Sequence, residues 1–321
     1  MTVSVLFGQQ VDRLGPLVDT ARLCAERDLT LWLGQSMKIE THAALAAVAG
    51  HGVSVETGLG VTLAPLRTPF EALTQARSVA ALMGRRVHAG YGIGSMSMAQ
   101  GLLQHALPRP ASYVAGYLSD LKALQATAED PTAHHPGLRM MPMEAPEVQV
   151  GCGVLRPGMA RTAGGVADFV VSWLTPLSYL ATTLLSALDE GAARAGRKRP
   201  RVVSIVPCAV DRPGRTPVRL AAGSCGAHVQ LPHYADMLRT AGVHLTGDRA
   251  SDLRAALHAG LFTYGSPQDI ADTVSAHLRS GVDEVVLNMG SVGLQHGVPE
   301  ALQDLEAVLD RLPEVPTTER R

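Results

Sequence analysis

The sequence predicts one α/β domain, a closed (β/α)8 barrel of the TIM type that spans residues 1–312. Eight short apolar segments with strand character alternate with eight segments that repeat apolar residues at helical spacing, the order that parallel βαβ units produce. The 321 residues are enough for such a barrel, and a composition of 46% hydrophobic and 18% charged residues suits a large buried core. A doubly wound open sheet is the structural alternative, but it rarely runs to eight consecutive units without a separate domain.

The amino-terminal half contains four of the strand-and-helix units. The first strand is VSVLFG, and the helix after it carries Leu14, Leu17 and Ala21 on one face. The third helix has a clear start, because Thr68 is a favoured N-cap residue and Pro69 suits the first helical position. The expected strands are 3–8, 30–34, 53–63 and 86–94, and the expected helices are 14–29, 39–52, 68–85 and 111–125.

The carboxyl-terminal half contains the other four units. VQVGCG reads as the fifth strand and DEVVLNMG as the eighth, while the helix between Ser266 as N-cap and Gly281 is the best delimited of this half. The expected strands are 148–153, 168–174, 201–210 and 283–290, and the expected helices are 156–167, 177–195, 266–281 and 299–312.

Four segments fall outside this alternation. Residues 95–110 are expected to form a loop, and residues 129–147 a long connection whose histidines and methionines suit either a cover over the site or a solvated loop. Residues 211–265 are less regular and are expected to be an insertion with some helix. The polar segment 313–321 is expected to be a disordered tail.

Charge and composition exclude several classes of protein. With 28 Lys and Arg against 29 Asp and Glu, the net charge is −1, which argues against nucleic-acid binding. No apolar run approaches the roughly 18 residues of a membrane span, and the start MTVSVLFGQQVDR lacks a basic secretion signal, so we expect a soluble, cytoplasmic protein. The four cysteines lie far apart and read as reduced thiols, and the scattered histidines indicate no metal site.

Three stretches resemble the luciferase-like oxidoreductases, which use FMN or the deazaflavin coenzyme F420. They are TGLGVTLAPLRTPFEALTQARSVAALMGRRVHAGYGIGS, GCGVLRPGMARTAGGVADFVVSWLTP and YGSPQDIADTVSAHLRSGVDEVVLN, and they occur in the order of the family. The resemblance covers nearly the whole chain and implies a cofactor at the carboxyl-terminal mouth of the barrel. F420 is the expected cofactor, with FMN as the alternative.

The resemblance also implies cofactor-binding residues in strands three and four. Leu59, Gly60 and Val61 match the bulge where related enzymes carry a cis peptide bond without proline; without the resemblance, these glycines would simply permit a β-bulge. A second expected cradle, in which small residues allow the backbone to approach a cofactor tail, consists of Gly92, Ile93, Gly94 and Ser95.

A phosphate site is expected after strand five. Backbone N–H groups and the start of the next helix favour an anion, and Arg156 stands there to pair with it, although an ordinary glycine turn would look the same. The backbone groups belong to Gly151, Cys152, Gly153 and Val154.

Candidates on the substrate side are Trp32, Gln35 and Trp173, although an isolated Trp is more often a core residue. Many F420-dependent sugar-phosphate dehydrogenases of the family show a histidine and a further Trp where this chain has W-L-G-Q. That departure argues against an alcohol oxidation, which needs a general base there. Tyr91 and Gln35 are the candidate catalytic residues, with Tyr91 or solvent as the proton donor.

The leading interpretation is therefore an oxidoreductase that transfers a hydride from reduced F420 to an organic substrate. The phrases V-L-R-P-G-M-A-R and P-L-R-T-P-F-E-A resemble the F420-dependent enzymes of lanthipeptide biosynthesis, which reduce dehydroalanine or dehydrobutyrine in a peptide. The alternatives are an FMN-dependent two-component monooxygenase and a non-catalytic flavin-binding barrel. The resemblance also implies a homodimer.

Overall fold

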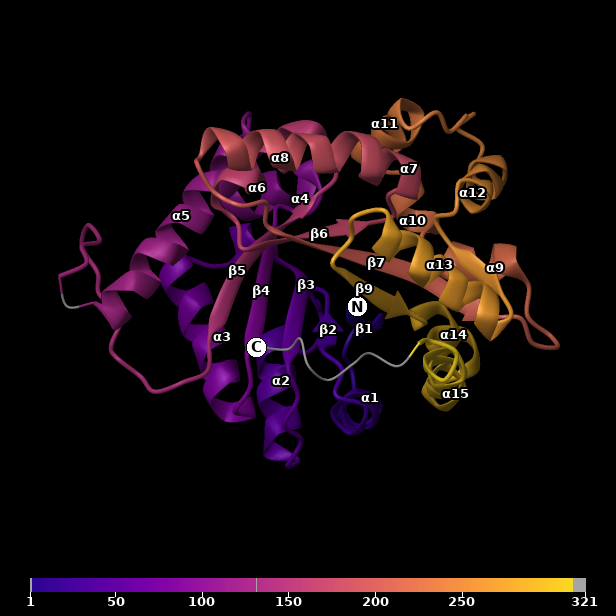
Figure 1. The fold of residues 1–321 in the computed structure, drawn as a ribbon, viewed down its shortest axis with the longest axis horizontal. Helices are drawn as coiled ribbons and strands as arrows, with labels where there is room; N and C mark the ends of the chain where they lie inside the picture. Colours follow the sequence, from indigo (N-terminus) through magenta and orange to yellow (C-terminus); the bar gives the residue numbers. More distant parts are fainter. Residues whose placement is uncertain (1, 131, 314–321) are drawn as a thin grey trace.

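The computed structural model describes residues 2–130 and 132–313, and eight parallel strands in these ranges form a closed barrel surrounded by helices (Figure 1). Strands β1 to β7 pair in chain order, β7 pairs with β9, and β9 pairs with β1, which closes the barrel. The predicted (β/α)8 barrel is confirmed.

The strands agree with the predicted segments to within a few residues. The barrel strands are β1 (Thr2–Phe7), β2 (Leu31–Leu33), β3 (Thr57–Leu63), β4 (Val87–Gly92), β5 (Val148–Val154), β6 (Phe169–Trp173), β7 (Arg201–Val210) and β9 (Glu284–Asn288). A short additional strand, β8 (Thr263–Gly265), was not predicted and pairs with the end of β7 outside the barrel.

The helices that cover the barrel also lie where the periodicity places them. They are α1 (Leu14–Glu26), α2 (Thr41–Gly50), α3 (Pro69–Met83), α5 (Pro110–Glu129), α6 (Pro157–Val166), α8 (Leu185–Arg194), α13 (Pro267–Arg279) and α15 (Val298–Leu309). Thr68 caps α3 by accepting a hydrogen bond from the Glu71 N–H, and Ser266 forms a capping box with Asp269 at the start of α13. Before α8, α7 (Leu177–Tyr179) continues into a π-helical turn, η2 (Leu180–Leu184).

The expectation of a loop over residues 95–110 was wrong. Residues Met96–Leu103 form α4, which Ser95 caps by accepting a hydrogen bond from the Met98 N–H. Met96, Ala99 and Leu103 recur at helical spacing, but the segment is short and only Ala99 is buried, so it forms an exposed helix that adds little to the core. A second unpredicted helix, α14 (Gly290–His296), follows β9.

The segment predicted as an insertion contains four helices between β7 and β8. They are α9 (Pro217–Ser224), α10 (Gly226–Val229), α11 (Pro232–Thr240) and α12 (Arg249–His258), and they gather on the side of the barrel opposite α5 (Figure 1). Asp304 of α15, which is fully buried, pairs with Arg212 and Arg215 just before α9 and so ties the start of this segment to the barrel. Most of the predicted tail, residues 314–321, lies outside the described residues.

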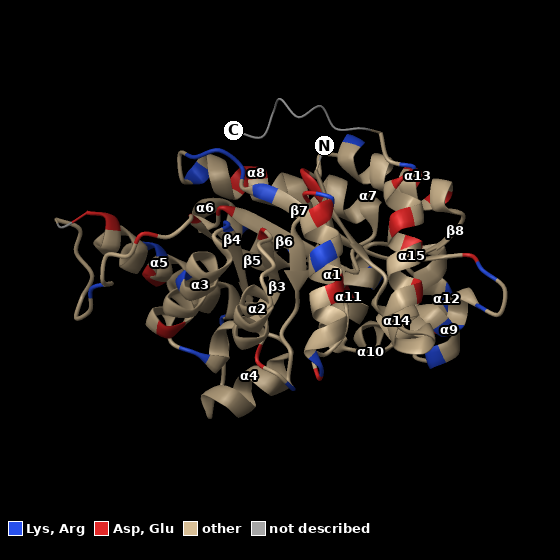
Figure 2. Ribbon diagram, turned by 90° about the horizontal axis from the view of Figure 1, so that it is seen from below, with Lys and Arg blue, Asp and Glu red and all other residues tan. Residues whose placement is uncertain are grey.

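Two surface features bear on the expectations about partners. Basic and acidic residues are interspersed over the outer helices and loops in the view of Figure 2. Among the described helices, none is both long enough and apolar enough to cross a membrane. The connection between α5 and β5 lies at the amino-terminal end of the strands, because it leads into the start of β5, so its described part does not cover the carboxyl-terminal mouth.

The interior of the barrel is filled at its amino-terminal end by a polar layer beneath an aromatic one. Glu284 pairs with Arg201 and accepts a 2.8 Å hydrogen bond from the indole Nε1 of Trp32. Trp32 in turn stacks on His88, with 5.8 Å between ring centroids, and meets the edge of Phe169. This arrangement closes the barrel floor with a buried carboxylate whose partners come from β7 and, across the barrel, from β2.

Replacing Trp32 with Phe should destabilise the protein by about 2–4 kcal/mol, because Glu284 loses a buried donor and the smaller ring leaves a cavity. Urea unfolding at pH 7 measures the loss. As a control, Leu294→Ala on α14, where the side chain is 66% exposed, should change the free energy of unfolding by less than about 0.5 kcal/mol. Equal midpoints for the two variants would contradict this account of the floor.

Candidate functional site

At the carboxyl-terminal mouth of the barrel, the side chain of Val61 on β3 lies against glycines of β4 and β5. A Cβ atom built on Gly92 would lie 2.7 Å from a methyl group of Val61, and one on Gly153 would lie 3.5 Å from the other methyl group. Gly60, Val61, Gly92 and Gly153 are all partly exposed. The structure thus brings together four predicted residues from β3, β4 and β5 into a flat apolar floor.

The backbone of β3 departs from regular pairing at this point. The Gly60–Val61 peptide bond is cis, at the position that the family resemblance indicates, and the register with β4 shifts between Leu59 and Thr62. Gln35 supports the displaced strand: its N–H donates to the Val61 carbonyl at 3.0 Å, and its side-chain oxygen accepts from the Leu63 N–H at 3.3 Å. Since the amide Nε2 also donates to the Ser36 carbonyl, the Gln35 side chain supports the backbone of β3, and its catalytic role stays a prediction.

Several predicted residues face away from the mouth. Leu59, Cys152 and Val154 are buried between the barrel and its helices, so only their backbone groups can reach a ligand. Tyr91 is also buried on this outer side, where its hydroxyl lies 3.4 Å from the Ala72 carbonyl of α3 and burial raises its pKa. The prediction of Tyr91 as proton donor is therefore wrong, because odd and even residues of a strand point to opposite faces.

The two tryptophans take different places. Trp32 is fully buried in the aromatic layer beneath Gly58 and Gly60, so the prediction that it lines the substrate pocket is wrong. Trp173, at the end of β6, is partly exposed and packs on the apolar interior from above. Trp173 is thus the predicted pocket residue whose side chain lies at the mouth.

The predicted phosphate site lies where β5 runs into α6. Arg156 occupies the N-cap position of α6, and its guanidinium pairs with Asp236 of α11 at 2.9 Å. Both side chains are about half exposed, so this ion pair contributes little to stability. Arg156 is therefore at the expected place but already has an acidic partner.

The second predicted cradle continues β4. Gly94 has a left-handed φ of 69°, which glycine adopts without steric cost, and Ser95 caps α4 rather than pointing to an open cradle. Gly92 and Ile93 remain partly exposed beside the floor.

Sequence reasoning missed the side chains that the insertion contributes to the mouth. The ring of His228 on α10 meets the edge of Trp173 at 5.8 Å between centroids, and Tyr234 of α11 lies 5.4 Å on its other side. Burial, and then the neighbouring His233, lower the pKa of His228, so it is neutral at pH 7. A histidine on a four-residue helix in an irregular segment carries no sequence signal that could have identified it.

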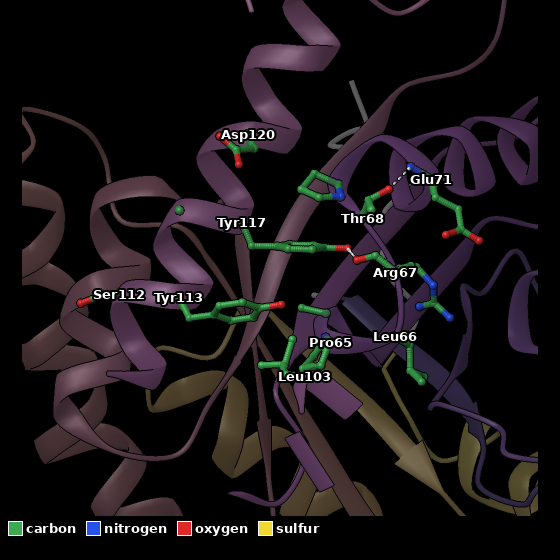
Figure 3. Close-up of a pocket in the computed structure, with 13 residues that line it drawn as sticks. Pro65, Leu66, Arg67, Thr68, Glu71, Leu103, Ser112, Tyr113, Tyr117 and Asp120 are labelled. Atoms are coloured by element: carbon green, nitrogen blue, oxygen red, sulfur yellow. Dashed lines mark hydrogen bonds between the residues drawn. The ribbon is translucent and has the colours of Figure 1, made fainter. Parts of the chain in front are cut away.

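A cavity of about 680 Å³ lies at the rim beside the mouth rather than above the barrel axis. Figure 3 shows Tyr113 and Tyr117 of α5 pointing toward the short 3-10 turn η1 (Ala64–Leu66), and the Tyr117 hydroxyl donates to the Arg67 carbonyl at 3.2 Å. The sequence analysis did not predict this cavity, because its walls come from helices that are distant in the sequence.

Glu40, just before α2, holds the loop that carries Arg67 in place. The Glu40 carboxylate accepts hydrogen bonds from Arg67 and from the Ala43 N–H at the start of α2, and it also contacts His42. Burial alone would raise the pKa of Glu40, but the bonds to His42 and Ala43 and the charge of Arg67 lower it to about 2.

Because the pKa of Glu40 is lowered in the folded protein, its contribution to stability is full above the unfolded pKa of about 4.3 and disappears as the pH falls toward 2. The difference in free energy of unfolding between the wild type and Glu40→Gln should thus be constant from pH 7 to about 5.5 and shrink below pH 5. Urea unfolding at a series of pH values measures it. Glu144→Gln, at an exposed position, is the control; a Glu40 difference that does not change with pH would contradict the prediction.

These features define a class of protein: a barrel enzyme with a flat apolar floor at its mouth and a helix start with an arginine at the edge of that floor. The floor is apolar, and glycines at the ends of β3, β4 and β5 leave space above it for a planar ring. Arg156 and the start of α6 fit an anionic tail. The site therefore suits a flavin-like cofactor that carries a phosphate.

The sequence profile of the luciferase-like monooxygenase family matches residues 7–284, and the chain belongs to this family. No curated protein sequence matches significantly.

Three solved structures of the same fold represent two cofactors, F420 and FMN. An F420-dependent secondary alcohol dehydrogenase in complex with an F420–acetone adduct matches with a TM-score of 0.71 and 15% identity, over 96% of this chain and 98% of that chain. The coenzyme F420-dependent tetrahydromethanopterin reductase from Methanopyrus kandleri matches with a TM-score of 0.69 and 17% identity, over 98% and 100%. The oxygenating constituent of 3,6-diketocamphane monooxygenase from Pseudomonas putida, in complex with FMN, matches with a TM-score of 0.70 and 14% identity, over 98% and 99%. At these identities the likenesses show a shared fold, which in two of the three structures belongs to an F420-dependent enzyme and in the third to an FMN complex.

Proposed function

We propose that this protein is an F420-dependent reductase that saturates an activated carbon–carbon double bond, such as that of dehydroalanine or dehydrobutyrine in a peptide. The observation that carries the proposal is the absence of an ionisable side chain from the strand ends at the mouth, within the part of the chain that the structure describes. The inward positions there are Gly8, Gly34, Gly60, Gly92, Gly153, Trp173, Pro207 and Asn288.

Strand ends without a base suit conjugate reduction better than alcohol oxidation, which needs a base for the hydroxyl proton. His228 of the insertion is the titratable ring beside these strand ends, and its Nδ1 is buried away from a substrate. When bound, reduced F420 supplies the hydride, and the protein supplies position and shelter from water. Val61 and the three glycines support the flat face of the ring, Trp173 limits the space above it, and Arg156 with the start of α6 binds the phosphate. The two predicted proton donors are Tyr91 and solvent. Because Tyr91 lies outside the mouth, solvent is the proton source in this proposal.

The main alternative is an FMN-dependent two-component monooxygenase. It is supported by the similarity to the FMN complex from Pseudomonas putida, which has nearly the same TM-score as the F420-dependent structures. A flavin-binding barrel without catalysis is the alternative of another class, and cofactor-dependent turnover would exclude it.

Thermal shift with F420 and FMN in parallel distinguishes the first two functions. We expect F420 at 100 times its dissociation constant to stabilise the protein by about 2.7 kcal/mol and FMN at the same concentration to have a much smaller effect. Stabilisation by FMN alone would contradict the reductase and favour the monooxygenase.

Replacing Arg156 with Gln should weaken F420 binding about 10- to 100-fold and change the free energy of unfolding by less than about 1 kcal/mol, because its pair with Asp236 is exposed. Asp236→Asn provides the matched control: it breaks the same pair but leaves the arginine free, so affinity should be retained or improved. Fluorescence titration of F420 measures both. Equal losses in the two variants would show that the ion pair, rather than Arg156, supports the cofactor.

We also propose a homodimer that packs through α2 and α3, and a cytoplasmic location. The α3 surface includes Leu82, whose side chain is 60% exposed, which suits a face covered by a second copy.

A further inference from the structure

His228 is the histidine of the insertion that lies beside the mouth, and it has no assigned role. Its ring stands between Trp173, at the end of β6, and Tyr234 of α11, in edge-to-face contact with both. The two aromatic residues hold the imidazole in one orientation by packing alone, since no hydrogen bond from a described residue to the His228 ring is present.

The two ring nitrogens of His228 have different surroundings. Nδ1 is buried and has no hydrogen-bond partner among the described residues, whereas Nε2 is not enclosed in this way. A buried acceptor without a partner is tolerated better than a buried N–H donor without one. The proton of the neutral ring therefore belongs on Nε2, which leaves an N–H donor directed to the open side.

The groups around this ring do not compete for that donor. His233 and Tyr234 are the titratable neighbours, and Arg156 and Asp236 on the far side of His233 pair with each other. At the strand ends, glycines and apolar side chains form the floor. This N–H donor has no partner among the described residues, and aromatic packing holds it next to Trp173 at the mouth. We therefore infer that its hydrogen-bond partner is a bound ligand.

We propose that His228 is a catalytic residue of the proposed reductase: its Nε2–H donates a hydrogen bond to the carbonyl oxygen conjugated with the double bond of the substrate. This inference rests on the proposed function and deepens it, since it requires a substrate with a carbonyl group attached to the α-carbon of the double bond.

The role follows from where charge develops. When bound, reduced F420 would be the reductant: one of its C–H bonds breaks and the cofactor is left oxidised, while the hydride bonds to the β-carbon and the π bond of the C=C group breaks. The electron pair of that bond moves to the α-carbon and is shared with the carbonyl oxygen, and a solvent proton then bonds to the α-carbon. A neutral imidazole N–H stabilises the negative oxygen without giving up its proton, as a fixed donor in an oxyanion hole does.

The test uses the full-length protein with F420 and N-acetyldehydroalanine N-methylamide as the probe. His228→Ala should lower kcat by about 10²- to 10³-fold, the usual effect of removing one donor to a developing oxyanion, while the affinity for F420 stays within threefold. His228→Gln keeps an N–H donor and should retain an intermediate rate. His244→Ala, at an exposed position in the same insertion, is the matched control and should retain the wild-type rate.

A second readout does not depend on turnover. In cofactor-free protein labelled with ¹⁵N, the His228 ring, assigned by its loss in His228→Gln, should show the Nε2–H tautomer. Its Nε2 signal should also shift when the saturated amide N-acetylalanine N-methylamide is added.

The outcomes separate the two proposals. If the wild type turns over the probe and the kcat of His228→Ala lies within threefold of the wild-type kcat, the proposed role of His228 is wrong. The proposed reductase activity is then still supported. If the wild type does not turn over the probe, the proposed reductase activity is contradicted. A shift of the Nε2 signal on addition of the saturated amide would still support His228 as a carbonyl-binding residue. An Nδ1–H tautomer, or no shift at saturating amide, overturns the inference in either case.

Discussion

The packing of Trp32 across the barrel axis is the contact on which the site depends. Its indole is fully buried, donates to Glu284 below and would collide with any side chain at Gly58. Phe169 of β6 imposes the same requirement on Gly151 of the adjacent strand β5. Because these two rings fill the centre, the strands around them must carry glycine, and the barrel mouth above starts from a nearly flat layer.

This floor explains why the chemistry of the site is divided between the barrel and the insertion. Glycine and valine at the ends of β3, β4 and β5 provide a surface for a planar ring but no group that polarises a substrate. Asn288 at the end of β9 already accepts a hydrogen bond from the Gly290 N–H, and the insertion brings a further polar side chain, His228, against Trp173. In the proposed reductase, the barrel provides the surface for the cofactor, and the insertion provides the hydrogen-bond donor to the substrate carbonyl.

The insertion is connected to the barrel by contacts of unequal strength. The fully buried Asp304 pairs with Arg215, which is also buried, and removal of one partner from such a pair typically costs 3–5 kcal/mol. At the other end, the pair of Arg156 with Asp236 is exposed and weak. The insertion is thus firmly attached at its base and loosely attached over the phosphate site, where an anionic ligand would compete for the same arginine.

The sequence by itself determined the eight-stranded barrel, the order of its elements and the glycine positions of the floor. Alternation of apolar segments, N-caps such as Thr68 and Ser266, and glycine in strands are local properties that are readable along the chain. The tertiary structure alone decided which face each strand residue presents at the mouth. It placed Tyr91 against α3, Trp32 beneath the floor and Gln35 on the backbone of β3. It also brought His228 to Trp173 across 55 residues of sequence, because contacts between an irregular insertion and a strand end depend on packing that no local pattern records.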